Sequence, residues 1–274
     1  MRDADATVSR LTRQPAHTAL FFDFDGSLAP IVEHPDDARP LPAVPGLLRR
    51  LVPRVGRVGV VSGRPVAFLV RHLPVEGLAI AGLYGMESVV DGARVVDARV
   101  RPYLGAVAAA AAELRDRFPA DVVEDKEGVA VTLHWRPAPE LAGEVRAAAD
   151  EVARRYGLAQ LPTRMAVELR PPVAIDKGVT VDGLASGFAV GAFAGDDTGD
   201  LPAFAALRAA VARGSLSDAV CIGVRSAEAP PDLLDQADLV VDGPAGLAAL
   251  LARVADEIPE PVGGGPGGGE TPEV

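Results

Sequence analysis

One stretch near the start of the chain decides the fold: Ala19-Leu20-Phe21-Phe22-Asp23-Phe24-Asp25-Gly26-Ser27-Leu28. Its first four residues are apolar, which predicts a buried strand of a parallel sheet. Side chains two residues apart on a strand point the same way, so Asp23 and Asp25 would share one direction at its carboxyl end. Two such carboxylates repel each other, and a divalent cation such as Mg²⁺ would neutralise them. The alternative is an ordinary turn at Asp25-Gly26, with Asp23 as a capping residue.

The composition limits both the architecture of the chain and its partners. The 274 residues fit one large domain or two modest ones, and a hydrophobic fraction of 49% is enough for a packed core. The net charge of −11 argues against a nucleic-acid surface, and no apolar stretch is long enough to span a bilayer. The single cysteine, Cys221, excludes an internal disulfide, and residues 1–18 lack the apolar region of a signal peptide. We therefore expect a cytoplasmic protein that binds neither nucleic acid nor a membrane.

The pattern of apolar runs divides the chain into a larger α/β unit and an insertion. Short buried strands alternate with helices over residues 19–100 and 174–256, which predicts a core domain with a parallel sheet flanked by helices. Between them, residues 101–173 show a helix, a hairpin, a second helix and a strand, which predicts a small inserted α+β cap domain. Residues 1–18 are expected to form an N-terminal segment that could be flexible. The Gly- and Pro-rich residues 257–274 are expected to be a disordered tail.

Polar side chains of complementary kinds follow several of the predicted core elements. In chain order they are Asp23 and Asp25, then Ser62 and Gly63, then Lys177, and finally Asp196, Asp197 and Asp200. Ligands of open parallel sheets bind beyond the carboxyl ends of the strands, where hydroxyls, free amides and a lysine suit a phosphate. Each group by itself could be a helix cap or a solvated surface residue. Together and in this order they predict one pocket for a phosphate and a cation.

This set of residues resembles the four motifs of the haloacid dehalogenase (HAD) superfamily of phosphohydrolases. The matching residues are Asp23-Phe24-Asp25-Gly26-Ser27, Ser62, Lys177, and Gly195-Asp196-Asp197 with Asp200. Ser27 stands where the superfamily usually has threonine, and it keeps the hydroxyl. The resemblance covers most of residues 19–255 and implies an α/β fold, with a HAD-like Rossmannoid core and an inserted cap.

The same resemblance implies a covalent mechanism. Asp23 would attack phosphorus and form an aspartyl-phosphate, and Asp25 would act as the general acid and base. Lys177 and Ser62 would hold the remaining phosphate oxygens, so that catalysis depends mainly on positioning and electrostatics.

A bound Mg²⁺ is also implied by the resemblance. Its ligands would be Asp23, the backbone carbonyl of Asp25, and Asp196, and it would offset the charge of the phosphoryl group. Asp197 and Asp200 would lie behind these ligands and support them.

Further motifs resemble the trehalose-6-phosphate phosphatase family. They are Ser62-Gly63-Arg64, Gly82-Leu83-Tyr84-Gly85-Met86-Glu87, Glu124-Asp125-Lys126, His134-Trp135-Arg136, and Glu168-Leu169-Arg170-Pro171 before Lys177-Gly178. Three positions depart from the family pattern. Tyr84 replaces a histidine, Trp135 replaces a tyrosine, and Gly199-Asp200-Leu201 replaces Thr-Asp-Glu.

This second resemblance implies hydrolysis of trehalose 6-phosphate and a functional link to a trehalose-phosphate synthase. The implied substrate-binding residues are Gly63, Arg64, Glu87, Glu124, Lys126, His134, Glu168 and Arg170. Of these, Glu124, Lys126 and Glu168 would grip the distal glucose. Without the resemblance, the charged residues on the predicted strands of the cap slightly favour a different interpretation, in which they form exposed ion pairs on a solvated face of the cap. Two other functions stay open, namely another HAD sugar phosphatase of the sucrose-phosphate or mannosylphosphoglycerate type and a non-catalytic phosphosugar-binding subunit.

Overall fold

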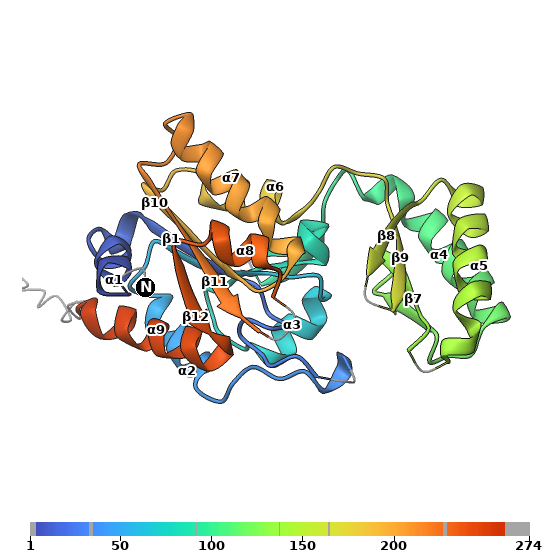
Figure 1. The fold of residues 1–274 in the computed structure, drawn as a ribbon. Coiled ribbons are helices and arrows are strands. Elements are labelled where there is room, and N and C mark those ends of the chain that lie inside the picture. Colours follow the sequence, from blue (N-terminus) through green and yellow to red (C-terminus); the bar gives the residue numbers. More distant parts are fainter. Residues whose placement is uncertain are drawn as a thin grey trace, which may run out of the picture.

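Two sheets form the framework of the protein, which a computed structural model describes over residues 4–260 except 33, 34, 91, 137, 164, 227 and 228. The larger sheet has eight strands in the order β12-β11-β10-β1-β2-β3-β4-β5 (Figure 1). Strands β12 to β3 of this order run parallel, and β4 and β5 add antiparallel at one edge. The strands are β1 (Thr18–Phe22), β2 (Arg57–Val61), β3 (Ala79–Gly82), β4 (Glu87–Val90), β5 (Ala93–Val96), β10 (Val190–Gly195), β11 (Asp218–Arg225) and β12 (Leu239–Asp242).

Helices cover both faces of this sheet (Figure 1). One face carries α1 (Ala4–Thr12), α2 (Val44–Leu51), α3 (Val66–His72) and α9 (Gly243–Glu257), and the other carries α6 (Lys177–Ala185), α7 (Leu201–Ala212) and α8 (Pro231–Gln236). Every residue of β1 and β10 is buried, because alternate side chains enter the two apolar layers. Phe22 packs in the first layer and Phe21 in the second. The predicted parallel α/β sheet is therefore confirmed.

The register of the sheet brings several strand ends to the same edge. Phe22 of β1 lies opposite Val60 of β2 and Ala194 of β10. Because these strands are parallel, the residues that follow them emerge together, among them Asp23 and Asp196. This edge is where the predicted phosphate pocket would lie.

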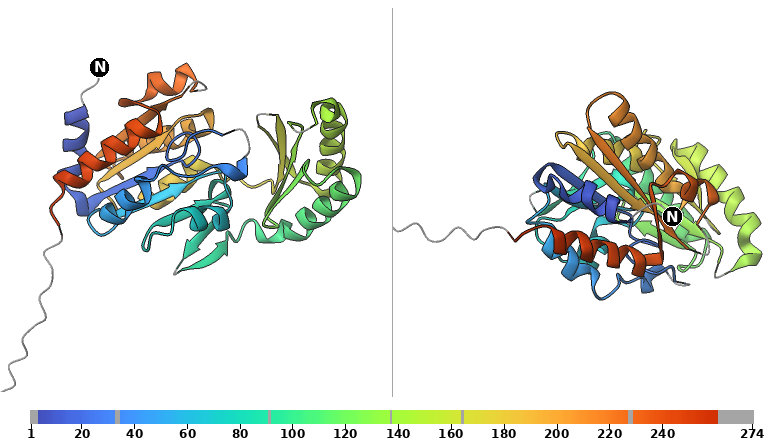
Figure 2. Two further views of the ribbon diagram at one scale, coloured as in Figure 1. Left: turned by 90° about the horizontal axis from the view of Figure 1, so that it is seen from below. Right: turned by 60° about the vertical axis from the view of Figure 1, so that its left-hand side comes forward.

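The smaller sheet belongs to a second lobe (Figure 2) and is antiparallel, in the order β6-β7-β9-β8. We call it the cap sheet. Its strands are β6 (Val123–Lys126), β7 (Ala130–His134), β8 (Ala159–Thr163) and β9 (Ala166–Arg170), and its helices are α4 (Leu104–Arg117) and α5 (Ala142–Tyr156). Val131, Leu133 and Leu169 pack from the sheet against Ala110 of α4 and Val145 of α5. One face of the sheet is therefore filled by the lobe's own apolar core.

Strand β8 is absent from our sequence-based prediction, which had only a hairpin and one further strand in this lobe. Its sequence, Ala-Gln-Leu-Pro-Thr, includes Pro162, which cannot donate a backbone hydrogen bond. The structure accommodates Pro162 because β8 is an edge strand of the cap sheet. Short 3₁₀ helices connect other elements. They are η1 (Pro15–His17), η2 (Pro35–Asp37), η3 (Leu83–Gly85), η4 (Arg101–Tyr103), η5 (Pro139–Leu141) and η6 (Thr198–Asp200).

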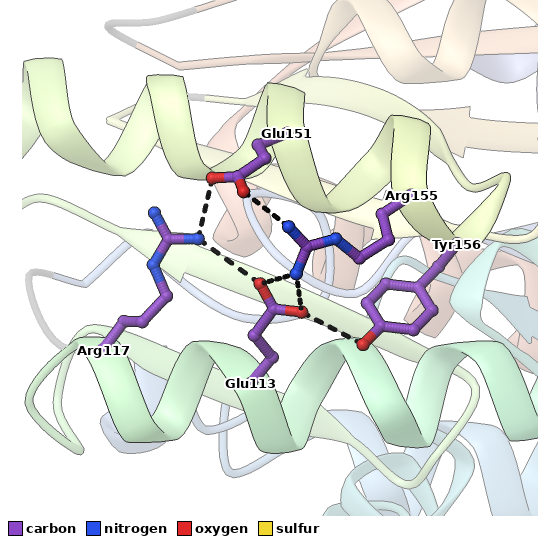
Figure 3. A network of polar contacts seen from close by, with 5 residues as sticks. All are labelled: Glu113, Arg117, Glu151, Arg155 and Tyr156. Carbon is purple, nitrogen blue, oxygen red and sulfur yellow. Dashed lines mark hydrogen bonds and ion pairs between the residues drawn. The ribbon is translucent and has the colours of Figure 1, made fainter.

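A network of ion pairs joins the two helices of this lobe (Figure 3). Arg155 of α5 donates to both carboxylate oxygens of Glu113 of α4 at 2.8 Å, and the Tyr156 hydroxyl donates to the same carboxylate at 3.0 Å. Arg117 bridges Glu113 and Glu151. Such exposed pairs each contribute little to stability, and the apolar core between the helices and the cap sheet contributes the main packing of this lobe.

The N-terminal segment differs from our expectation. Residues 4–12 form helix α1, which packs against α9, and Val8 and Leu11 are buried in the core. These two side chains are three residues apart and therefore lie on one face of the helix. The expectation of a flexible segment was wrong for this part of residues 1–18.

The C-terminal end of the described chain is also more ordered than expected. Helix α9 runs to Glu257, Ile258 is buried in the core, and Arg54 pairs with Glu260 at 2.6 Å. The prediction of disorder was therefore wrong for residues 257–260, and residues 261–274 lie outside the described part. Within the described residues, no helix is both long and apolar enough to cross a membrane.

Substitution of Leu11 tests the contribution of α1 to the core. We expect Leu11→Ala to lower the free energy of unfolding by about 2–5 kcal/mol, because it removes a buried side chain from a packed layer. Ser9→Ala on the exposed side of the same helix should change it by less than about 0.5 kcal/mol. Chemical denaturation measures both, and equal effects would mean that α1 does not pack as described.

Candidate active site

A buried lysine lies between two buried aspartates at the carboxyl ends of β1 and β10. Lys177 Nζ is 2.9 Å from Asp23 Oδ1 and 2.6 Å from Asp200 Oδ1. Lys177 is 3% exposed and Asp200 is fully buried. An ammonium group in such surroundings is stable only with carboxylate partners, and here the two carboxylates raise the pKa of Lys177 well above its ordinary value against the effect of burial. Lys177 therefore stays charged within the site.

Local structure fixes each member of this triad. The Asp23 backbone N–H donates to Ala194 O at 2.9 Å, which continues the β1–β10 pairing by one residue. Lys177 is the first residue of α6, where the Asp176 side chain accepts the backbone N–H of Val179. Asp200 Oδ2 accepts backbone N–H groups from the loop after β10. The three side chains thus come from three different parts of the chain, and separate hydrogen bonds fix the backbone at each of them.

Three carboxylates could together hold a metal ion. Asp23, Asp196 and Asp200 each offer one oxygen, and these oxygens lie within 4.8 Å of one another. Both oxygens of Asp200 are already engaged, one by Lys177 and one by the amides of Asp196 and Asp197. Asp23 and Asp196 are therefore the better candidates for direct ligands, with Asp200 behind them.

The electrostatics of these carboxylates favour the binding of a cation. Burial, together with the charges of Asp200 and Asp197, raises the pKa of Asp196 to about 8. Burial also raises the pKa of Asp23 well above its ordinary value, although Lys177 opposes the shift. A divalent cation would favour the ionised forms and remove this conflict.

Gly26 provides the space that Asp196 occupies. A Cβ atom at this position would lie 2.0 Å from Asp196 Oδ2, and Gly26 has a φ of +76°. Both facts require glycine in this part of the first motif.

Asp25 pairs with an arginine, whereas Asp23 and Asp200 pair with Lys177. Arg64 donates to both oxygens of Asp25, from Nε to Oδ2 at 2.7 Å and from Nη2 to Oδ1 at 2.8 Å. The Arg64 guanidinium also stacks over Phe68, 4.5 Å from the ring centroid. Arg64, which we predicted to bind substrate, therefore holds the carboxylate of Asp25 in a defined orientation.

Ser62 and Gly63 lie beside Tyr84 rather than in open space. The buried Ser62 Oγ accepts the backbone N–H of Arg64 at 3.2 Å, and Ser62 O accepts the backbone N–H of Tyr84 at 2.8 Å. A Cβ atom on Gly63 would lie 2.9 Å from the Tyr84 hydroxyl oxygen. The tyrosine that replaces the family histidine thus packs directly against the second motif.

The predicted sugar-binding residues lie on the cap sheet. His134 Nε2 lies 2.8 Å from Glu124 Oε2, and Lys126 Nζ donates to Glu168 Oε2 at 2.8 Å. In the sheet register, Glu124 lies opposite Thr132, which in turn lies opposite Glu168. The cap sheet thus brings these side chains together on neighbouring strands.

Arg170 connects the two lobes. Its guanidinium lies over the ring of Tyr84, 5.0 Å from the centroid, and donates to Ile175 O at 2.8 Å. Arg170 is buried, and Tyr84 lies close enough to Glu168 and Lys126 for their charges to act on its hydroxyl. This contact brings the sugar-binding candidates of the cap sheet next to the second motif of the core.

Glu87 has a different environment from the one we expected for a substrate ligand. It is buried, and one of its oxygens accepts the backbone N–H of Val66 at 2.6 Å, in the first turn of α3. Its other oxygen pairs with Arg94. Both carboxylate oxygens thus have partners in the core. Glu87 therefore supports the fold and does not present a free oxygen to a substrate.

Sequence reasoning missed Thr132 and Phe68. Thr132 is buried and lies between two of the predicted sugar ligands. The alternation of β7 could have identified it, because it shares a face with His134. No local pattern identifies Phe68, because Arg64 precedes the helix on which Phe68 lies.

Known proteins resemble this chain in sequence and in fold. The family model described as Trehalose-phosphatase matches residues 21–232. A trehalose-phosphate phosphatase of Mycolicibacterium paratuberculosis is 36% identical over 255 residues, which cover 88% of this chain and 63% of the relative.

Solved structures share the fold. A trehalose-6-phosphate phosphatase related protein superposes with a TM-score of 0.71 at 24% identity, covering 87% of this chain and 97% of the other. The C-terminal domain of the Candida albicans trehalose-6-phosphate phosphatase gives 0.71 at 19% identity, covering 92% and 96%. The chain spans less than two thirds of the length of its mycobacterial relative. Because the family model and this relative both match most of the chain, it belongs to the trehalose-phosphatase family.

Proposed function

We propose that this chain is a Mg²⁺-dependent phosphatase that hydrolyses trehalose 6-phosphate to trehalose and phosphate. The observation that carries the proposal is the Lys177 ammonium between Asp23 and Asp200 in a buried site. Such a charge can stabilise both a carboxylate nucleophile and the phosphoryl group that it attacks. The choice of substrate is supported by membership of the family and by the polar residues of the cap sheet.

The proposed reaction has two steps. First, a carboxylate oxygen of Asp23 attacks phosphorus while Asp25 gives a proton to the leaving sugar oxygen, which releases trehalose and leaves an aspartyl-phosphate. Then Asp25 takes a proton from water, whose oxygen attacks phosphorus and releases phosphate from Asp23. Arg64 orients Asp25 for both transfers, and Lys177 and Ser62 hold the phosphate oxygens.

The cation of this site is proposed to be Mg²⁺. The donors are carboxylate oxygens of Asp23 and Asp196 with the backbone carbonyl of Asp25, which suits a hard ion. Three observations support the fit: the close approach of the carboxylate oxygens, the raised pKa of Asp196, and the space that Gly26 leaves for it. When bound, Mg²⁺ supplies positive charge that offsets the charge of the phosphoryl group.

The distal glucose is proposed to bind Glu124, Lys126 and Glu168. Glu168 Oε1 is buried and has no hydrogen-bond partner among the described residues, and such an oxygen is costly unless a ligand or water pairs with it. A sugar hydroxyl is a suitable partner. Membership of the family supports trehalose 6-phosphate over the sucrose-phosphate and mannosylphosphoglycerate alternatives.

A non-catalytic phosphosugar-binding subunit is a weaker proposal, since the chain retains both Asp23 and Asp25. A functional link to a trehalose-phosphate synthase and a cytoplasmic location stay predictions. Phosphate release over a panel of sugar phosphates with Mg²⁺ separates these functions.

Replacement of the nucleophile tests the covalent mechanism. Asp23→Asn should reduce phosphate release from trehalose 6-phosphate by at least about 10⁴-fold, because the amide cannot attack phosphorus. Substrate binding to the variant should stay measurable by calorimetry. Retained turnover would rule out Asp23 as the nucleophile.

Stability as a function of pH tests the metal site. In EDTA, the folded state keeps a proton on Asp196 up to a pH of about 8, whereas the unfolded carboxyl has its ordinary pKa of 3.8. The unfolded state thus binds fewer protons in this window, so the contribution of Asp196 makes stability fall as the pH rises from about 4 to 8. Asp196→Asn should flatten that fall, whereas Asp232→Asn at an exposed position of α8 should leave it unchanged.

The same variants separate metal binding from stability. Mg²⁺ should raise the Tm of the unaltered protein and of Asp232→Asn at pH 8, because it binds the folded state only. It should not raise the Tm of Asp196→Asn. An equal rise in all three proteins would place the cation elsewhere.

Selective loss of one substrate tests the role of the cap sheet. Glu124→Gln should lower kcat/KM for trehalose 6-phosphate by about 10-fold or more, because it removes the charge of a sugar ligand. Turnover of p-nitrophenyl phosphate should change less than about twofold. Glu144→Gln, on the exposed side of α5, is the control that should affect neither substrate. Equal losses on both substrates would mean that Glu124 does not contact the sugar.

A further inference from the structure

Two polar atoms of the cap sheet are buried without a hydrogen-bond partner among the described residues. Thr132 Oγ1 and Glu168 Oε1 form no hydrogen bond within the part of the chain that the structure describes. Thr132 is 2% exposed and Glu168 is fully buried. A buried polar atom without a partner costs free energy, so each atom is expected to pair with a ligand or an ordered water.

The two atoms belong to neighbouring residues. Thr132 of β7 and Glu168 of β9 are direct cross-strand partners in the antiparallel register, and Glu124 of β6 lies on the other side of Thr132. Cross-strand partners have Cβ atoms about 4.5–5.5 Å apart and point to the same face. One small molecule can therefore contact both side chains.

The shared face is the one turned toward the core domain. Val131 and Leu133, the sequence neighbours of Thr132, pack into the apolar core with α4 and α5. Figure 1 and the left view of Figure 2 show these helices on the side of the cap sheet that faces away from the core domain. Thr132 and Glu168 thus point away from the helices, as a contact to a substrate bound between the lobes requires.

Charges around the pair limit the chemistry of its ligand. Lys126 holds the other oxygen of Glu168, and Arg170 Nη1 lies 3.9 Å from Oε1. These cations disfavour a metal ion, and the carboxylates of Glu168 and Glu124 disfavour a second phosphate. A neutral hydroxyl fits, because it can accept from threonine and donate to a carboxylate.

We propose that Thr132 is a specificity-determining residue, which donates a hydrogen bond to a sugar hydroxyl that in turn donates to Glu168 Oε1. This inference rests on the proposed function and extends its set of sugar ligands by one residue. The two bonds strengthen each other, since a hydroxyl that accepts a hydrogen bond is a better donor. The χ1 angle of threonine is restricted on a strand. The Thr132 hydroxyl therefore points in a fixed direction, which determines where the accepting hydroxyl of the ligand can lie.

Removal of the hydroxyl at constant shape tests the proposal. Thr132→Val should raise KM for trehalose 6-phosphate about three- to tenfold with kcat within about twofold, because the contact is remote from the reacting phosphorus. Hydrolysis of p-nitrophenyl phosphate should be unchanged. Thr132→Ser, which retains a hydroxyl, should stay within about threefold of the unaltered enzyme, and so should Thr163→Val on exposed β8.

The thermal stability of the ligand-free variants excludes a purely structural explanation. Thr132→Val should keep or raise the Tm, because it removes a buried hydroxyl without a partner. A lower Tm together with equal losses on both substrates would show that the hydroxyl supports the fold instead, and would overturn the proposal.

Failure of this inference can be told apart from failure of the proposed function. If the unaltered enzyme hydrolyses trehalose 6-phosphate and Thr132→Val does so with the same KM, water satisfies the hydroxyl and only the inference falls. If the unaltered enzyme hydrolyses no sugar phosphate of the panel but still cleaves p-nitrophenyl phosphate, the proposed function falls and the sugar contact falls with it.

Discussion

The pairing of the buried Lys177 ammonium with Asp23 and Asp200 is the interaction on which the rest of the site depends. Taking one ammonium and two carboxylates out of water is costly, and only their mutual attraction and the backbone amides on Asp200 offset that cost. With every group ionised, the charges of these three groups would sum to −1, and Asp196 would add another negative charge beside them. Because burial and mutual repulsion raise the pKa values of Asp23 and Asp196, full ionisation of the site needs a cation to balance its negative charge. A cation bound by these carboxylates at the edge of the sheet would also offset the charge of a phosphoryl group.

The β6–β7 hairpin of the cap lobe makes both apolar and polar contacts with the core. Val129 and Ala130 of the β6–β7 hairpin belong to one apolar cluster with Leu83 and Met86 of the core. Arg94 of the core donates to the backbone oxygen of Glu127 at the tip of that hairpin. These contacts hold the polar face of the cap sheet toward the core. The proposed division of labour places phosphate chemistry in the core and sugar recognition on the cap sheet.

The sequence was sufficient for the parallel sheet because its strands are continuous apolar runs. It was sufficient for the order of the motifs because three of the four follow such a run and Lys177 begins a predicted helix. It was insufficient where a side chain's partner lies far away in the chain. The pairing of Asp25 with Arg64 and the burial of Glu87 beside Val66 depend on how strands and helices meet, which no local pattern encodes. The docking of α1 depends in the same way on α9, at the opposite end of the described chain.

The most direct test of the central claim is a crystal structure of the protein with Mg²⁺ and trifluoroberyllate, which mimics a phosphoryl group on a carboxylate. The account predicts beryllium on a carboxylate oxygen of Asp23, Lys177 Nζ within hydrogen-bonding distance of a fluoride, and one cation that contacts both Asp23 and Asp196. Beryllium on another residue, or a cation that does not touch Asp196, would contradict it.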